Sequence, residues 1–450
     1  MKSNIFREYD IRGIVGEELS ESTVSIVARA IGTFFRQNGA LRIAVGRDMR
    51  LSSEPFSRLL TQGLNESGCD VVDIGMVPTP VLYYAVHTKP VDGGVMITGS
   101  HNPANHNGFK ICLRKEAIYG PQIAEILAIA ESGEFASGSG KCTRTDILDD
   151  YCSDIISRLK MGGRRIRAVI DGGNGMGCIT ALPVYDRLGV ETIPLFPEPD
   201  GNFPNHHPDP TVPENLQALI SAVVEKRADL GIAFDGDGDR IGVVDDRGRI
   251  IWGDELMIVL SRAVLSEIPG AAIIAEVKCS QKLFDDIERQ GGKPIMWKAG
   301  HSLIKAKMKE TGAALAGEMS GHIFFADRFF GFDDANYAGG RILELLSHTD
   351  KPFSSLFADI PHTVSTPEIR VPCPDDKKFE VVSRIADYFS GNYKVITIDG
   401  ARVIFDDGWG LVRASNTQAI LVLRFEAVDE SSLGRIRGEI EGKLAELLAN

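Results

Sequence analysis

The feature that most constrains the fold is a repeated alternation of short β-branched segments with longer amphipathic ones. Residues 41–48 (LRIAVGRD) have the pattern of a strand, residues 52–68 that of a helix, and residues 70–75 (DVVDIG) that of a second strand. The strand-like pattern returns at 165–177 (RIRAVIDGGNGMG) and at 271–279 (AAIIAEVKC). Strands separated by helices favour mostly parallel sheets that are covered by helices on both faces.

The length of the chain and its breaks in pattern predict several domains. A chain of 450 residues is too long for one ordinary core and fits about three or four domains. Residues 131–146 are small, polar and rich in glycine and serine, which marks a first boundary. Residues 194–213 carry seven prolines and indicate an extended surface loop. After about Pro361 the pattern is one helix with hairpin strands, typical of a small α+β unit.

We therefore predict an α/β protein with three similar mixed-sheet α/β domains and a smaller α+β C-terminal domain, around one central cleft. The predicted domains span residues 1–145, 146–248, 249–361 and 362–450. Each would contribute one polar, mostly glycine-rich loop to the cleft, because strand ends form the binding edge of such folds. These loops are VMITGSHN (95–102), IAFDGDGDR (232–240), LAGEMSGH (315–322) and GLVRASNTQ (410–418).

Composition and charge exclude several classes of protein. Hydrophobic residues make up 43% of the chain and charged residues 25%, as in soluble globular proteins. The net charge of −13 argues against a nucleic-acid partner, and no apolar segment approaches the roughly 18 residues of a membrane span. The seven cysteines are scattered without a Cys-x-x-Cys pair, as expected for reduced thiols. The charged N-terminal segment is unlike a signal peptide, so we expect a cytoplasmic protein.

The segment FDGDGDR places Asp235, Asp237 and Asp239 at alternate positions after an apolar strand. The glycines between them allow a tight loop that turns three carboxylates toward one point, which suits a hard cation. A solvated acidic turn is the structural alternative. A calcium loop of the EF-hand type fits poorly, because Arg240 takes the place of its glycine and Asp246 that of its glutamate. Open coordination positions favour Mg²⁺ with a phosphate, and Arg240 could hold a phosphate or sugar oxygen.

A second strand ends at Thr98-Gly99 and presents Ser100 in the motif TGSHNP. Serine, asparagine and proline are common in turns, so a purely structural interpretation exists. Strand ends are also where α/β folds present reactive groups. A phosphate on Ser100 would give a cation in the aspartate loop a further oxygen ligand, and the cation would stabilise the transferring phosphoryl group. Lys110, in the same segment, could neutralise charge or relay a proton.

Two further loops carry groups suited to a sugar phosphate. GEMSGH offers Glu318, Ser320 and His322 on a loop flanked by glycines, a grouping suited to a sugar diol. RASNTQ (413–418) combines a guanidinium, two hydroxyls, an amide and backbone donors, which suits a second phosphate that is held and not transferred. A structural loop of this composition is an equal alternative. A single histidine is usually structural, so His301 carries little weight by itself.

The motifs occur in a characteristic order, namely YDIRG (9–13), TGSHNP (98–103), DGNFPNHHPDP (200–210), DGDGDR (235–240), GEMSGH (317–322) and RASNTQ (413–418). In this order the sequence resembles the α-D-phosphohexomutase superfamily, and within it the bacterial phosphomannomutase/phosphoglucomutase group, over essentially the whole chain. The resemblance implies four domains in a heart-shaped arrangement, the first three with a shared topology. Gly99, where many relatives carry alanine, is a small substitution with no obvious cost.

The resemblance implies a role for each motif residue. Ser100 would be the phosphoserine that donates and recovers the phosphoryl group, and it would complete the metal site of Asp235, Asp237 and Asp239. Lys110 and His301 are the candidates for proton transfer at the reacting end. The residues implied to line that end are Arg12, Lys110, Arg240, Lys278 and His301. Those implied to bind the sugar phosphate are Tyr9, Lys278, Glu318, Ser320, His322, Arg413, Ser415, Asn416 and Thr417.

The resemblance also implies the reaction, an interconversion of hexose 1-phosphate and hexose 6-phosphate through a hexose 1,6-bisphosphate that turns end over end. One Mg²⁺ per chain and the bisphosphate, as activator and intermediate, are the implied cofactors. We expect small-molecule sugar phosphates as partners, and a monomer or weak homodimer. Relatives that act on glucosamine phosphate tend to carry glutamine where this chain has Met319, so we expect a preference for mannose and glucose phosphates.

Other functions remain open at this point. A phosphoglucosamine mutase would share the motifs and differ in the preferred hexose. A haloacid-dehalogenase-like phosphatase would use Asp235 as nucleophile and Asp237 as acid or base, although its loop is usually N-terminal and TGSHNP would be left without a role. A sugar-phosphate-binding or metal-binding protein without turnover is the third alternative.

Overall fold

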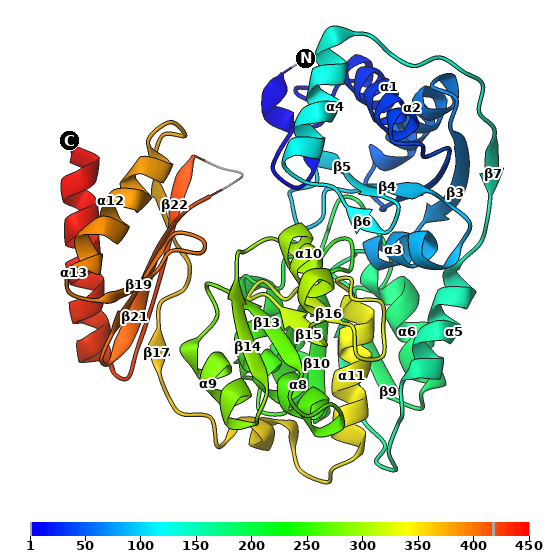
Figure 1. The fold of residues 1–450 in the computed structure, drawn as a ribbon. Coiled ribbons are helices and arrows are strands. Elements are labelled where there is room, and N and C mark those ends of the chain that lie inside the picture. The colour runs from blue at the N-terminus through cyan, green and yellow to red at the C-terminus, as the bar shows by residue number, and fades with distance from the viewer. Residues whose placement is uncertain (1, 416–418, 450) are drawn as a thin grey trace.

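The computed structural model describes residues 2–415 and 419–449. In this part of the chain, the strands form four sheets that follow one another along the sequence, each with its own helices (Figure 1). Domain I lies at the top of this view, domains II and III lie together below it, and domain IV stands to one side. The predicted fold class, three mixed-sheet α/β units and a smaller α+β unit, is confirmed. The predicted domain boundaries are kept as a division of the chain, except that β12 (Ile250–Ile251) belongs to the sheet of domain II.

Domain I is a mixed sheet with helices on both faces. Across the sheet, the strands are β1 (Ile11–Ile14), β5 (His106–Leu113), β4 (Gly93–Ile97), β2 (Arg42–Arg47), β3 (Asp70–Met76) and β7 (Cys142–Arg144), with β6 (Glu116–Ala117) beside β5. The helices are α1 (Glu21–Gln37), α2 (Ser53–Glu66), α3 (Thr79–Thr88) and α4 (Pro121–Ser132), after a short 3₁₀ turn at Ser3–Ile5. β5 runs antiparallel to β1 and β4, and the other main strands are parallel. The strands and helix predicted within 41–75 are confirmed as β2, α2 and β3.

Helix α1 shows why these segments form the elements they do. Its first turn is capped by Ser20, whose hydroxyl accepts from the Thr23 N–H at 3.2 Å. Its apolar side chains recur with helical spacing and are buried, among them Val24, Val27 and Ile31. This stripe packs with α2 and α4 on one face of the sheet, whereas α3 covers the opposite face (Figure 1).

Domain II has a sheet in which β10 is the central strand. In order, the strands are β12 (Ile250–Ile251), β11 (Ile241–Asp245), β10 (Leu230–Phe234), β8 (Arg167–Asp171) and β9 (Glu191–Leu195). The helices are α5 (Leu148–Arg158), α6 (Gly177–Arg187) and α7 (Gln217–Lys226), with a 3₁₀ turn at Pro213–Leu216. β8, β9 and β10 are parallel, and β11 returns antiparallel to β10. The loop of interest lies between β10 and β11, at the carboxyl end of a buried parallel strand.

Domain III repeats this plan with fewer strands. The order is β14 (Lys293–Trp297), β13 (Ala272–Glu276), β15 (Leu315–Gly317) and β16 (Ile323–Phe325). The helices are α8 (Gly253–Glu267), α9 (Gln281–Arg289), α10 (His301–Thr311) and α11 (Ala335–Ser347), followed by a 3₁₀ turn at Phe353–Phe357. The first three of these strands are parallel and β16 is antiparallel to β15. The GEMSGH loop therefore connects β15 and β16, at the same relative place as the aspartate loop of domain II.

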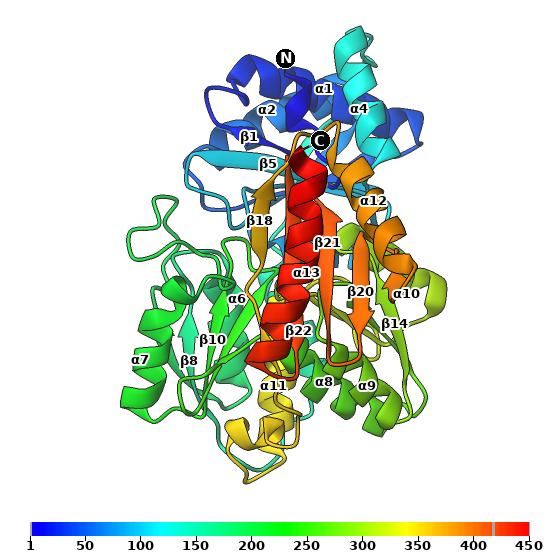
Figure 2. The same cartoon turned by 90° about the vertical axis from the view of Figure 1, so that its left-hand side faces the viewer.

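Domain IV is an antiparallel sheet with both helices on one face (Figure 2). The strands are β17 (Val364–Ser365), β22 (Ile420–Ala427), β21 (Gly408–Ala414), β20 (Ala401–Phe405) and β19 (Lys394–Ile396), and β18 (Ile369–Pro372) also pairs with β22. The helices are α12 (Lys378–Ser390) and α13 (Glu430–Ala449). Their apolar side chains and the sheet form a separate core, which includes Ile385, Phe389, Phe425 and Ile440.

The first three domains share a core. Helix α3 of domain I packs with α5 of domain II, where the rings of Tyr84 and Tyr151 are 5.6 Å apart. The same continuous set of buried apolar residues includes Ile232 of domain II and Leu315 of domain III. Burial of these apolar side chains is the main stabilising contribution and fixes the three sheets relative to one another. No helix in the described part of the chain is long and apolar enough to cross a bilayer.

The proline-rich segment 194–213 begins in β9 and carries no helix or strand from 196 to 212. Its prediction as a loop is confirmed, but its prediction as a surface loop is only partly right. Gly201, Pro208 and Pro210 are buried because the segment packs against loops of both domain I and domain II.

Candidate active site

The loop that follows β4 carries Ser100 to the boundary between domains I and II. Its backbone is in the left-handed region, with a φ of +48°, and its N–H donates to Thr98 Oγ1 at 2.8 Å. The side chain is buried, and its Oγ donates to Asp235 Oδ2 at 2.8 Å. Two residues that are 135 positions apart in the sequence therefore meet directly. The structure brings the predicted serine loop and the predicted aspartate loop together.

Asp235, Asp237 and Asp239 are fully buried, and one carboxylate oxygen from each lies within 4.8 Å of those from the other two. Gly238 between them has a φ of +75°, which gives the loop its sharp turn. Burial and the charges of its two neighbours raise the pKa of Asp235 well above its ordinary value. Asp237 Oδ1 is a buried oxygen without a hydrogen-bond partner in the described structure. A cation with oxygen ligands fits this donor set, because it would neutralise the cluster and use the orphaned oxygen.

Lys110 on β5 supplies positive charge to the same cluster. Its Nζ lies 2.7 Å from Asp237 Oδ2 and 2.5 Å from Asp239 Oδ2. Burial opposes the charged ammonium, but the aspartates outweigh burial and raise the pKa of Lys110. Thr79, at the start of α3, donates to Asp237 Oδ2 at 2.6 Å and fixes that carboxylate from the other side.

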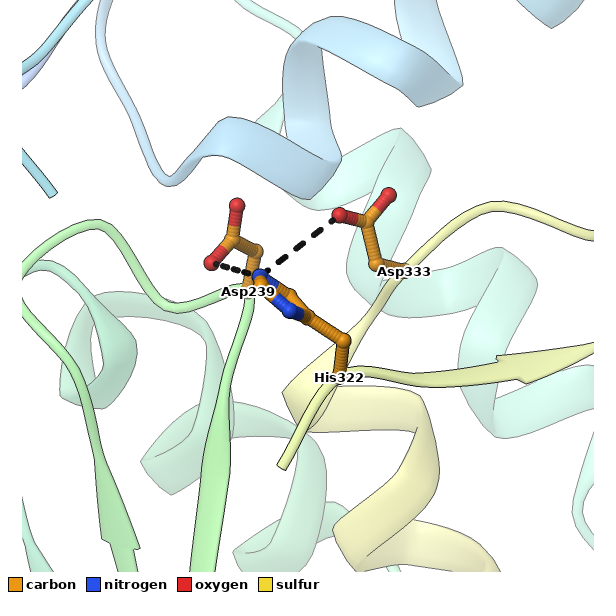
Figure 3. A group of neighbouring side chains, drawn as sticks. All are labelled: Asp239, His322 and Asp333. Atoms are coloured by element: carbon orange, nitrogen blue, oxygen red, sulfur yellow. Dashed lines mark hydrogen bonds and ion pairs between the residues drawn. The ribbon is translucent and has the colours of Figure 1, made fainter. Parts of the chain in front are cut away.

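His322 connects the aspartate loop to the GEMSGH loop (Figure 3). Its Nε2 lies 3.2 Å from Asp239 Oδ1 and 4.0 Å from Asp333 Oδ2, and its Nδ1 lies 2.8 Å from Glu318 Oε2. Burial disfavours the imidazolium, but Asp239 and then Glu318 raise the pKa of His322 to about 9. Glu318 also accepts from the Gly300 N–H at 2.7 Å. Burial raises its pKa, and bonds from His322 and Gly300 outweigh burial and lower it to about 2.

His301, at the first turn of α10, stacks on His322 with ring centroids 5.5 Å apart. Its Nδ1 lies 3.3 Å from Asp333 Oδ2, and burial followed by the nearby charge of Lys305 lowers its pKa. Tyr9 of domain I donates to the Ala299 carbonyl at 3.1 Å, so the segment before α10 also contacts domain I. The two histidines are thus held differently, one between two carboxylates and one beside Asp333 and a lysine.

Domain IV reaches the same region through Asp399. Its Oδ2 accepts from Arg413 at 3.0 Å and from the Ala299 N–H of domain III at 3.0 Å. Lys278, after β13, lies 3.2 Å from Glu368, so a second contact joins domains III and IV. Arg413 is buried and Lys278 is partly buried, as expected for cations that hold a phosphate.

Two of the remaining predicted residues, Arg240 and Ser320, contact this network. Arg240 Nε is 3.3 Å from His322 Nε2, and Ser320 Oγ is 3.2 Å from His322 Nδ1. Arg12 lies opposite Gly108 in the β1–β5 pair, and its guanidinium contacts Asp10 at 2.5 Å. Ser415 follows β21 and donates its N–H to the Ile420 carbonyl. Asn416 and Thr417 lie outside the described residues.

Sequence reasoning missed several residues of the site. Asp333 precedes α11 and faces both histidines, and Asp399 lies in a turn before β20. Arg50 lies behind the serine loop and donates to the Ser100 carbonyl at 2.7 Å. The rule that polar residues after a parallel strand belong to the binding edge would have found Arg50, which follows β2. Asp333 and Asp399 carry no such signal, since they reach the site only through the packing of domains.

Comparisons with known proteins agree over the whole chain. Family models of phosphoglucomutase/phosphomannomutase domains match residues 3–137 (alpha/beta/alpha domain I), 149–248 (alpha/beta/alpha domain II), 252–364 (alpha/beta/alpha domain III) and 368–443 (C-terminal domain). The phosphomannomutase/phosphoglucomutase of Pseudomonas putida is 48% identical over 440 residues, which cover 97% of this chain and 94% of the relative. The phosphoglucomutase of Neisseria gonorrhoeae is 47% identical over 443 residues, which cover 97% and 96%.

Solved structures give the same result. The crystal structure of a phosphoglucomutase/phosphomannomutase family protein from Burkholderia thailandensis has 43% sequence identity and a TM-score of 0.93, covering 99% of this chain and 98% of that one. An N-acetylglucosamine-phosphate mutase described as a member of the α-D-phosphohexomutase superfamily shares only the fold, at 13% identity, a TM-score of 0.58 and coverage of 90% of this chain and 76% of that one. The chain belongs to the phosphoglucomutase/phosphomannomutase family of the α-D-phosphohexomutase superfamily.

Proposed function

We propose that the protein is a phosphohexomutase that interconverts the 1-phosphates and 6-phosphates of mannose and glucose, with Ser100 as the phosphate carrier. The observation that carries the proposal is the 2.8 Å contact between Ser100 Oγ and Asp235, at the edge of three buried carboxylates. The names of the relatives support the same reaction class. A serine in this position can exchange a phosphoryl group with a sugar hydroxyl in both directions.

Asp235, Asp237 and Asp239 are the proposed ligands of one Mg²⁺, together with a phosphate oxygen on Ser100. When bound, the ion would withdraw charge from the phosphoryl group during transfer. Lys110 neutralises part of the same cluster from the domain I side, through Asp237 and Asp239. Arg240 is proposed to hold an oxygen of the phosphate or sugar beside it.

The proposed chemistry is two transfers with one reorientation between them. First, a hydroxyl oxygen of the hexose monophosphate attacks the phosphorus on Ser100 and its proton passes to a base, while the bond from phosphorus to Oγ breaks and Oγ takes up a proton from an acid. The hexose 1,6-bisphosphate then turns end over end. The Ser100 hydroxyl next attacks the phosphorus of the other phosphate and gives its proton to the base, and the released sugar oxygen takes a proton from the acid. Each proton taken is returned, so the enzyme ends as it began.

The groups proposed for proton transfer are Lys110 and His301, and the geometry adds His322 as a third. The ring of His301 stacks on that of His322, and His322 bridges Asp239 and Glu318. Comparing Lys110→Met, His301→Gln and His322→Gln separates them. Substitution of the residue that acts as acid or base should lower kcat about 10²–10⁴-fold. Substitution of a residue that only binds the substrate should mainly raise KM.

Substrate binding is proposed to be nearly symmetric about the sugar ring. Glu318 would bind O3 and O4, which exchange places when the bisphosphate turns. Arg413 and Ser415, with Asn416 and Thr417 in the same loop, would hold the phosphate that is not being transferred, and Lys278 would assist from domain III. Tyr9, Ser320 and Arg12 would line the same space. Because mannose and glucose share their O3 and O4 stereochemistry, such a site would accept both.

The test is the chemical nature of the enzyme-bound phosphate. Enzyme labelled by hexose 1,6-bisphosphate should keep its phosphate in acid and release little to hydroxylamine, as a phosphate ester does. Ser100→Ala should lose labelling and several orders of magnitude in kcat, while its far-ultraviolet spectrum stays unchanged. A label released by hydroxylamine would indicate an acyl phosphate on Asp235 and the phosphatase alternative.

A further inference from the structure

A buried arginine lies behind the loop that carries Ser100, on the side opposite the aspartates. Arg50 follows β2, and its side chain has no exposed surface. Its guanidinium nitrogens donate to the carbonyls of Ser100 (2.7 Å), Asn102 (2.5 Å), Pro103 (2.6 Å) and His106 (2.9 Å). One rigid, planar guanidinium therefore holds several carbonyls of the serine loop, which a lysine could not do with the same geometry.

Asp48 completes the support from inside domain I. Its Oδ2 lies 3.2 Å from Arg50 Nε and accepts from the Gly99 N–H at 3.2 Å. Its Oδ1 accepts from Ser53 Oγ at 2.5 Å and from the Arg50 N–H at 3.0 Å. A buried guanidinium needs such a partner, since an unpaired buried charge is strongly destabilising.

The DGNFPNHHPDP segment of domain II covers the same arginine, and the proposed function gave this motif no role. The Phe203 ring lies 5.2 Å from the Arg50 guanidinium. Gly201 lies so close to Met49 and Arg50 that a β-carbon at its position would meet their main-chain atoms at 2.8 and 2.9 Å. The motif therefore needs both its glycine and its aromatic residue to close over Arg50.

The same segment also supports the aspartate loop. Pro208 packs against Gly236, where a β-carbon would come within 3.4 Å of the proline ring. A β-carbon on Gly236 would also meet the Ser100 carbonyl oxygen at 2.4 Å, so the two loops are in direct contact. The segment thus touches Arg50 on one side and the loop of Asp235 on the other.

We infer that Arg50 is a positioning residue for phosphoryl transfer, held over the serine loop by Phe203 of the DGNFPNHHPDP segment. It touches no reacting atom and acts through Ser100, whose Oγ must keep its place beside Asp235. This inference rests on the proposed function, since it concerns the same serine. Displacement of a reacting group by about 1 Å can cost on the order of 10²-fold in rate, so this support belongs to kcat rather than to substrate binding.

Gly99 provides a way to disturb the arginine without removing it. A β-carbon at Gly99 would meet the Arg50 guanidinium carbon at 2.5 Å and its Nε at 2.6 Å. The guanidinium cannot yield easily, because it is buried and bonded to the loop carbonyls. The sequence alone suggested that glycine and alanine are interchangeable here, whereas in this chain the glycine makes room for Arg50.

The test uses the full-length enzyme with Arg50→Lys, Phe203→Leu and Gly99→Ala. The matched control is Arg341→Lys, because Arg341 is also buried, pairs with Asp327 at 2.8 Å and lies 4.4 Å over the Phe325 ring. We expect Arg50→Lys to lower kcat about 30–100-fold and the two milder variants about 3–10-fold, with KM within about threefold. Arg341→Lys should lower Tm to a similar degree and leave kcat within about twofold. If kcat follows Tm equally in both arginine variants, or if KM rises instead, the inference is wrong.

Single-turnover transfer of labelled phosphate from Ser100 to hexose 1-phosphate separates this inference from the proposed function. A wild-type enzyme that takes up no label would overturn the proposed function itself. If wild type takes up label and the Arg50→Lys variant transfers its label equally fast, only the positioning role of Arg50 is wrong. Phe203→Leu and Gly99→Ala keep the test valid where Arg50→Lys fails to fold.

Discussion

At the scale of single residues, the site is an accumulation of buried charge. Asp235, Asp237 and Asp239 have no exposed surface, and their charge is opposed by Lys110 and by the protonated His322. Burial and then the like charges of Asp237 and Asp239 raise the pKa of Asp235. Despite burial, which favours the neutral form, Lys110 lowers the pKa of Asp237, and Lys110 and His322 lower that of Asp239, so that both stay ionised. A divalent cation would relieve the remaining repulsion.

Removing the metal should therefore abolish activity and measurably lower the free energy of unfolding. We expect excess chelator to stop turnover and Mg²⁺ to restore it. Mg²⁺ at about 100 times its Kd should stabilise the fold by about 2–3 kcal/mol, since it binds only the folded site. Thermal unfolding with and without Mg²⁺ measures this, and Asp237→Asn should remove most of the shift. Full activity in chelator, with no metal by elemental analysis, would contradict the expectation.

Substrate preference is a second question at this scale, and it concerns Met319. Its N–H donates to Glu276 at 3.0 Å and its side chain packs partly on the shared core, so it offers no polar group near C2 of a sugar. We expect comparable kcat/KM for mannose and glucose 1-phosphates and a roughly tenfold to thirtyfold lower value for glucosamine 1-phosphate. Met319→Gln should narrow this gap, and Glu318→Ala should lower all three values alike. Glucosamine 1-phosphate as the best substrate would refute the preference.

At the scale of elements, the ends of strands and helices were the predictable part. Ser100 and Asp235 each follow a buried parallel strand, so their positions could be inferred from pattern alone. That the two loops face each other was also predicted, whereas the direct contact of Ser100 Oγ with Asp235 could not be, because it depends on the packing of two domains. Asp333 and Asp399 were missed for the same reason. Arg50 follows β2, so the strand-end rule would have indicated it, but its contacts with main-chain carbonyls have no signature in the sequence.

Helix α11 carries a pH-sensitive element at its first residues. Asp334 caps it by accepting from the Tyr337 N–H at 2.9 Å, and Tyr151 donates to the same carboxylate at 2.8 Å. Burial raises the pKa of Asp334 to about 7 from an ordinary 3.8. Between about pH 4 and 7 the unfolded chain has lost this proton and the folded protein keeps it, so stability should fall as pH rises.

Asp334→Asn tests this, since an amide keeps the cap without the charge. Relative to wild type, the free energy of unfolding of the variant should increase by on the order of 2 kcal/mol as the pH rises from 4 to 7. Tm measured in steps across this range should fall more steeply for wild type than for Asp334→Asn. Parallel curves would show that the carboxyl group is not responsible.

At the scale of the whole molecule, domain IV is joined to domain III by a small apolar cluster of Val277, Trp409 and Leu411 and by polar contacts near the site. Asp399 bonds both Arg413 and the Ala299 N–H, and so connects the proposed phosphate loop to domain III. Asp399→Asn keeps an acceptor for the N–H and loses the charge opposite Arg413. We expect KM to rise roughly tenfold, with kcat and Tm changed little. The control is Asp407→Asn at an exposed ion pair with Arg435, which should change neither. A fall in kcat with unchanged KM would contradict this role for Asp399.

The shared core of the first three domains also bears on how such a chain can be recombined with a relative. A transplanted domain II would have to match side chains of α3 and of domain III across one continuous core, and any mismatch in volume there is destabilising. Domain IV has its own core, and its Arg402 and Arg424 dock on the main-chain carbonyls of Val277, Lys278 and Cys279, with side-chain contacts to Gln281 and Asp254 beside them. Carbonyls are present in every sequence. We therefore expect chimeras that exchange domain IV to fold and those that exchange domain II alone to be insoluble, so that the molecule recombines as two modules rather than four.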